Sequence, residues 1–207
     1  MEPRDSRPPR RLREGGLVSK SQGAQFVVLC EDLQSQVFIR RALIRAGTNQ
    51  RRIRLVALPA TIKAGAGHAY VIQRYPNEVK AFRTQNAKAA TGLVAHLDAD
   101  DKTVAERHAE LAKSLQKAGE HPREDGEPII ELVPKRNIET WLYALDASLS
   151  GGPLDEETKY SKFKDSESRC AKAAEAFADH ARKNTEPSSA KSVPSLLDGL
   201  AEFKRQR

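Results

Sequence analysis

The feature that most constrains the fold is an alternation of short apolar runs with amphipathic segments, beginning near residue 25. Four runs are apolar almost throughout and short enough to be strands buried on both faces: 25–30, 53–58, 93–97 and 129–133. Between them lie three segments with apolar residues at helical spacing: 35–46, 77–90 and 103–118. Such an alternation is typical of a parallel sheet covered on both sides. We therefore predict an α/β fold of Rossmann-like type, with a four-stranded parallel sheet flanked by helices.

The alternation ends near residue 146, and the segments before and after the α/β domain have a different composition. We expect the α/β domain to span residues 24–146, closing with a short helix at 138–145. Residues 147–207 contain only helical patterns and are predicted to form a helical C-terminal extension. Residues 1–23 are rich in Arg, Pro and Gly and poor in apolar residues, which indicates a disordered basic tail.

The composition argues against a membrane or secreted protein. No run approaches the ~18 apolar residues of a membrane helix, and the N-terminus lacks the apolar core of a secretory signal. Cys30 and Cys170 lie in apolar or Ala-rich stretches, so we expect both to be reduced and buried. Without CxxC or HxxxH spacing, a zinc site is disfavoured. These observations predict a cytoplasmic protein with no membrane association.

The net charge of +7 is distributed unevenly along the chain. Residues 25–97 carry a net charge of +8, whereas residues 98–207 carry −4. A basic half favours a polyanionic partner, and nucleic acid is the usual one. The alternative is that Arg-rich helices simply face water.

Acidic residues follow two of the predicted strands, at the point where each strand ends. Glu31 and Asp32 come after the first strand, and Asp98 and Asp100 after the third. Because the carboxyl ends of parallel strands meet at one edge of a sheet, we expect these carboxylates to converge there. An extended chain would also point Asp98 and Asp100 in the same direction. A shared cation would relieve their repulsion, and oxygen-only ligands favour Mg²⁺ or Mn²⁺. Alternatively, Asp100 or Asp101 only caps the next helix.

The Glu after one strand and the Asp-x-Asp pair after another resemble the TOPRIM domain of topoisomerases, primases and OLD-family nucleases. The resemblance covers about residues 24–145 and is strongest to small stand-alone bacterial TOPRIM-like proteins, often associated with antiphage defence. The family often has Gly after the Glu, where this chain has Asp32. The resemblance implies Mg²⁺-dependent phosphodiester chemistry, with Glu31 as acid/base or metal ligand and Asp98 and Asp100 as ligands. It also implies an ATPase encoded by a neighbouring gene as a partner.

The same relatives carry a segment like 135–141 after the last strand. From the residues alone, Glu139 is either a further metal carboxylate, which would permit two ions, or a charge stabilising a helix N-terminus. Lys135 and Arg136 are candidate phosphate contacts. Trp141 fits a core position better than a base-stacking platform.

Other basic residues are weaker candidates for nucleic-acid binding. In the loop 63–68, glycines would permit close approach to a phosphate, and Lys63 and His68 would add charge, although the loop could be merely flexible. Arg40 and Arg41 lie mostly off the apolar stripe of their predicted helix and complete the set of candidates.

Three functions fit these patterns. The favoured one is a metal-dependent nuclease. The second is a non-catalytic nucleic-acid-binding subunit whose carboxylates only hold Mg²⁺. The third is a receiver-like regulatory domain using Glu31-Asp32, Asp98 and Lys135, which would leave Asp100 and the basic half without a role and lacks a fifth strand.

Overall fold

A four-stranded, all-parallel sheet forms the centre of the molecule. The computed structural model describes residues 25–59, 67–86, 92–146, 154–162 and 166–206. Its sheet has the order β2-β1-β3-β4. The strands are β1 (Phe26–Cys30), β2 (Ile53–Leu55), β3 (Gly92–His96) and β4 (Ile129–Leu132). The predicted α/β architecture is confirmed, although β2 ends earlier than expected.

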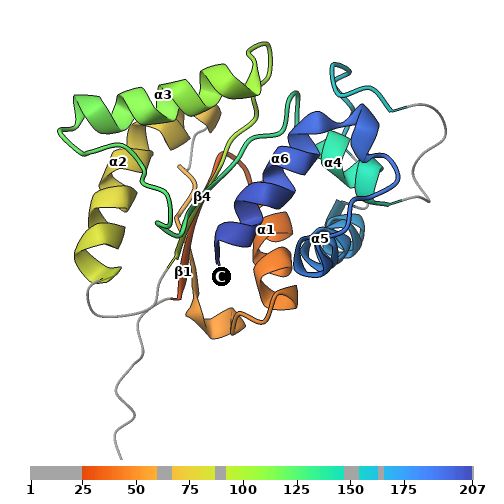
Figure 1. The fold of residues 1–207 in the computed structure, drawn as a ribbon, viewed down its shortest axis with the longest axis horizontal. Helices are drawn as coiled ribbons and strands as arrows, with labels where there is room; N and C mark the ends of the chain where they lie inside the picture. Colours follow the sequence, from red (N-terminus) through yellow and green to blue (C-terminus); the bar gives the residue numbers. More distant parts are fainter. Residues whose placement is uncertain (1–24, 60–66, 87–91, 147–153, 163–165, 207) are drawn as a thin grey trace, which may run out of the picture.

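Helices cover both faces of this sheet (Figure 1). One face carries α2 (Gly67–Asn86) and α3 (Val104–Lys117). The other carries α1 (Leu33–Arg45), α4 (Ile138–Leu145), α5 (Ser166–Lys183) and α6 (Pro194–Phe203). Short 3-10 turns occur at Gln50–Arg52, Ala190–Ser192 and Lys204–Gln206. No helix in the described part of the chain combines the length and apolar character needed to cross a bilayer.

The two central strands are buried on both faces, which explains their almost uninterrupted apolar sequence. Alternate residues of β1 point to opposite sides of the sheet: Val28 packs toward α1 and α5, and Leu29 toward α2 and α3. β1 and β3 pair along their whole length, from Phe26 opposite Gly92 to Cys30 opposite His96. Their carboxyl ends therefore lie side by side.

The C-terminal helices share the core of the α/β domain. The ring of Trp141, fully buried in α4, stacks on Phe177 of α5 with 5.6 Å between ring centroids. Phe38 of α1 meets the same tryptophan edge-on at 6.4 Å. In α6, Gly199 permits close approach, because a Cβ atom there would lie 2.3 Å from the Trp141 ring. The core interpretation of Trp141 is confirmed.

Helix α2 begins ten residues before the predicted start at residue 77. Pro76, read as a helix-opening signal, lies inside the helix. A buried face of Val71, Tyr75 and Val79 runs continuously past it. That packing outweighs the cost of about 3 kcal/mol for an interior proline. The predicted loop 63–68 lies mostly outside the described residues, as does the predicted tail 1–23.

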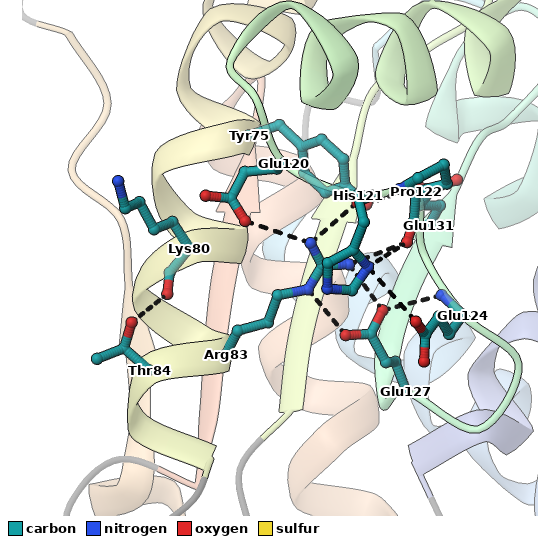
Figure 2. Close-up of polar contacts among 10 residues, drawn as sticks. All are labelled: Tyr75, Lys80, Arg83, Thr84, Glu120, His121, Pro122, Glu124, Glu127 and Glu131. Carbon is teal, nitrogen blue, oxygen red and sulfur yellow. Dashed lines mark hydrogen bonds and ion pairs between the residues drawn. The ribbon is translucent and has the colours of Figure 1, made fainter.

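Several basic residues of the 25–97 segment are neutralised by acidic residues. Figure 2 shows Arg83 of α2 reaching the connection before β4. It donates to both carboxylate oxygens of Glu127, at 2.8 and 2.9 Å, and to the carbonyls of His121 and Pro122. Two further carboxylates bind arginines in the same way: Glu78 with Arg54 and Arg74, and Asp179 with Arg45. The charge asymmetry along the sequence is therefore partly cancelled within the fold.

Candidate functional site

Carboxylates gather at the carboxyl ends of the two central strands. Because Cys30 pairs with His96, the residues that follow, Glu31 and Asp98, leave the sheet side by side. Their carboxyl groups lie within hydrogen-bonding reach of each other. Glu139, in the first turn of α4, also acts electrostatically on Asp98. The sheet and α4 thus place two predicted metal ligands, Glu31 and Glu139, within electrostatic range of a third, Asp98.

The pKa values of these three carboxyl groups are raised, chiefly by burial. Burial raises the pKa of Asp98 well above its usual range, and the charge of Glu31 acts in the same direction. Burial also raises the pKa of Glu31, partly offset by hydrogen bonding with Asp98. The pKa of Glu139 is raised, again chiefly by burial. Without a bound cation, burial therefore favours the protonated form of each of these carboxyl groups.

Two of the oxygens are buried without a partner. Asp98 Oδ1 and Glu139 Oε1 accept no hydrogen bond from any described residue, and Glu139 is only 1% exposed. Leaving a buried charged oxygen unpaired is costly unless a ligand satisfies it. An all-oxygen set with unfilled acceptors suits Mg²⁺ or Mn²⁺. Across the described ranges, no three His, Cys, Asp or Glu side chains are already gathered closely enough to hold one ion.

Asp32 lies at the edge of the cluster and has a structural role. It is the N-cap of α1, where Oδ1 accepts from the Ser35 N–H at 2.8 Å. Its Oδ2 accepts from Lys162 Nζ at 3.0 Å. Although burial acts to raise the pKa of Asp32, these two partners lower it. The residue that departs from the family pattern thus stabilises the helix beside Glu31.

Asp100 reaches the cluster by a different route from the one expected. Strand β3 ends at His96, and Asp100 adopts a left-handed conformation with φ +54°. The prediction of an extended segment from Asp98 to Asp100 is therefore wrong, because a turn directs the Asp100 side chain. Oδ1 accepts from Lys159 Nζ at 2.9 Å, and Oδ2 lies 3.8 Å from His68 Nδ1. Asp100 still acts electrostatically on Glu31.

The helix-capping alternative for Asp100 and Asp101 is also wrong. Thr103 is the N-cap of α3, and its hydroxyl accepts from the Glu106 N–H at 3.1 Å. The Glu106 carboxylate in turn accepts a hydrogen bond from the Thr103 N–H at 2.7 Å, which completes a capping box. Asp101 instead accepts from Arg136 Nη1 at 2.6 Å, and Asp100 accepts from Lys159.

The predicted phosphate contacts are not all near the cluster. Arg136 lies beside it and donates to the Asp100 carbonyl at 2.9 Å, and His68 opens α2 next to Asp100. Lys135 instead pairs with Glu157 at 2.8 Å. Arg40 and Arg41 lie on α1 at least eight residues beyond Asp32, about 12 Å along the helix axis. Lys63 falls outside the described residues.

Sequence reasoning missed three basic residues beside the cluster. Arg107 of α3 is 3% exposed and donates to the Asp98 carbonyl at 3.1 Å. Lys159 and Lys162 come from a connection with no periodic pattern, so no local signal identifies them. Gly67, expected to approach a phosphate, packs against Glu31 instead. A Cβ atom there would lie 2.8 Å from Glu31 Cβ.

His96 lies beneath the cluster and is fully buried, with neither ring nitrogen bonded to a described residue. Burial lowers its pKa to about 4 from an ordinary value of 6.5. Below pH 6.5 the unfolded chain therefore binds a proton that the folded protein rejects, and stability is lost as pH falls toward 4.

We accordingly predict that His96→Leu gains stability relative to wild type on acidification. Between pH 7 and 4.5 the difference in unfolding free energy should shift by about 2 kcal/mol in favour of the variant. Urea denaturation of both proteins at the two pH values measures the shift. Comparing the two proteins cancels the titration of the carboxylates. If the difference in unfolding free energy between the two proteins were the same at both pH values, His96 would not be buried in its neutral form.

Comparison with protein-family models, curated proteins and solved structures finds no match to this chain. The TOPRIM resemblance therefore rests on the motif and its placement.

Proposed function

We propose that this protein is a metal-dependent nuclease of TOPRIM type that uses Mg²⁺ or Mn²⁺. The observation that carries the proposal is the group of Glu31 and Asp98 at the ends of the central strands with Glu139 from the first turn of α4, in which two buried oxygens have no partner among the described residues. These residues would hold the ion, together with Asp100 after a side-chain movement. A bound ion would neutralise charge at the scissile phosphate and lower the pKa of a bound water.

The chain's own residues would supply the remaining chemistry. Glu31 can hold or move a proton, because burial raises the pKa of its carboxyl group. Arg136 lies beside the carboxylates, where a phosphate would need a positive partner, and it also pairs with Asp101 at 2.6 Å. His68 lies 3.8 Å from Asp100, and burial lowers its pKa, which favours the neutral imidazole. Arg107 fixes the Asp98 backbone from the buried side. The site thus pairs candidate ligands with cationic groups, as phosphodiester hydrolysis requires.

The alternatives differ in their support. A non-catalytic nucleic-acid-binding subunit would use the same carboxylates and cations without the proton transfer. The receiver-like alternative has less support, because Lys135 pairs with Glu157 and the described sheet has four strands. A role in antiphage defence, an ATPase partner and a cytoplasmic location belong to the proposal only through the resemblance and the composition.

A cleavage assay on plasmid DNA and tRNA tests the proposal. We expect cleavage with Mg²⁺ or Mn²⁺ and none with EDTA, assayed with and without the product of a neighbouring ATPase gene. Nucleic-acid affinity should fall steeply between ~50 and ~200 mM salt, because phosphate contacts release counterions.

Negative results in these assays distinguish the candidate functions. Salt-dependent binding without cleavage under any metal would favour the non-catalytic subunit. Absence of binding to either nucleic acid would rule out both nucleic-acid functions. Stable labelling of Asp98 by acetyl phosphate would favour the receiver-like alternative.

A further inference from the structure

The segment 154–162, here called the strap, lies over the carboxylate cluster and is held from several directions. Asn137, at the start of α4, donates its side-chain amide to the Tyr160 carbonyl at 2.7 Å. The Tyr160 ring packs on Tyr143 with 4.7 Å between centroids. Glu156 accepts from the backbone N–H of Ser195 at 2.9 Å. These contacts make the position of the strap a property of the fold.

The strap directs two ammonium groups at the cluster. Lys159 Nζ lies 2.9 Å from Asp100 Oδ1, and Lys162 Nζ lies 3.0 Å from Asp32 Oδ2. Both lysines also interact electrostatically with Asp98. Their side chains are 58% and 67% exposed, so each has one ammonium face on carboxylate and another in water. Two lysines three residues apart therefore bind the outer acidic residues of both strand ends.

Ammonium groups and a divalent cation compete for such oxygens. The strap lysines together supply two positive charges, the same charge as one Mg²⁺ or Mn²⁺ ion. While the lysines hold Asp100 and Asp32, Asp98 Oδ1 and Glu139 Oε1 have no hydrogen-bond partner in the described part of the chain. An ion drawing on Asp100 must displace Lys159 from it. The freed ammonium would remain at the same edge of the sheet, with three donors free for phosphate oxygens.

We propose that Lys159 and Lys162 form an exchangeable counter-ion: without metal they neutralise Asp100 and Asp32, and they turn to phosphates of the nucleic acid once a divalent cation on Asp98, Glu139 and Asp100 displaces Lys159 and cancels the attraction of those carboxylates for Lys162. This inference rests on the proposed metal site and adds its coupling to substrate binding. Without nucleic acid, the strap lysines weaken metal binding because they compete for the carboxylates. With metal bound, the same lysines strengthen nucleic-acid binding.

The double variant Lys159→Gln/Lys162→Gln tests the exchange. Without nucleic acid, it should bind Mn²⁺ about three- to tenfold more tightly than wild type by calorimetry or electron paramagnetic resonance, because the competing ion pairs are gone. With Ca²⁺ in place of Mn²⁺, the double variant should bind single-stranded DNA less tightly than wild type does. The slope of log affinity against log salt should shrink by about 1–2. Lys172→Gln, which removes an exposed lysine paired with Asp146 at 3.2 Å, is the matched control and should change neither quantity.

Unchanged or weaker Mn²⁺ binding by the double variant would overturn the exchange. So would unchanged DNA affinity. If wild type itself binds no Mn²⁺, the proposed metal site fails first, which separates the two ideas.

A measurement on wild type alone covers the case in which the variant misfolds. Mn²⁺ should accelerate tryptic cleavage after Lys159 and Lys162 several-fold, because it breaks the two ion pairs that help hold the strap against the cluster, while cleavage after Lys172 stays constant. Equal rates with and without Mn²⁺, at a concentration where binding is measured, would reject the proposal.

Discussion

Asp98→Asn is expected to lower nucleic-acid cleavage by at least about a thousandfold while making the metal-free protein more stable. The loss of rate follows from removing the half-buried carboxylate at the centre of the candidate ligand set. The gain in stability follows from the raised pKa values of Asp98 and Glu31. An uncharged amide that can donate to Glu31 replaces a carboxylate that repels it.

The pH dependence gives the sign of the stability change. Because the folded pKa values are raised, the folded metal-free protein binds more protons than the unfolded chain, and its stability falls as pH rises through those values. At pH 7.5 the variant should therefore have a higher unfolding free energy than wild type. A gain of about 1 kcal/mol would raise the melting temperature of a chain of this size by about 2–4 °C. Metal should raise the melting temperature of wild type more than that of the variant.

Two further variants sharpen the result. Asp125→Asn removes a fully exposed carboxylate that pairs with Arg205 at 3.1 Å and should leave activity and stability unchanged. Glu139→Gln distinguishes one ion from two: a large loss of rate with intact folding, together with the loss of one of two bound Mn²⁺ ions, supports a second ion. Full activity in Asp98→Asn would show that the chemistry occurs elsewhere in the molecule.

The sheet could be predicted because its signal is local. Strands such as β1 and β3 are buried on both faces, and each needs an apolar run that is visible in the sequence. The meeting of Glu31 and Asp98 could be predicted as well, because adjacent parallel strands end at the same edge. Neither inference needed knowledge of the loops.

The parts that could not be predicted depend on contacts distant in sequence or on backbone conformation. Pro76 reads as a helix start, and only the buried face of α2 shows that the helix continues through it. The left-handed turn at Asp100 has no sequence signature beyond an Asp, which tolerates that conformation. Lys159 and Lys162 lie 59 and 130 residues from their partners. The neutralisation of Arg83 by Glu127 likewise required the fold.

Trp141→Ala is expected to have the largest effect on stability, a loss of about 3–5 kcal/mol in unfolding free energy. This is the largest fully buried side chain, and its ring joins three elements through Phe38, Phe177 and Gly199. Truncation would leave a cavity between α4 and the helices on either side, where the rigid α6 backbone limits collapse.

Urea unfolding followed by circular dichroism measures the loss, because Trp141 is the only tryptophan and its fluorescence disappears in the variant. Leu33→Ala is the matched control: this apolar side chain is 66% exposed and should cost under about 0.5 kcal/mol. Trp141 lies two residues after Glu139, so the variant should also weaken Mn²⁺ binding while it is still folded. A loss below about 1 kcal/mol would mean that the C-terminal helices are not part of the core that positions α4. Glu139 would then have to be positioned by the strand ends alone.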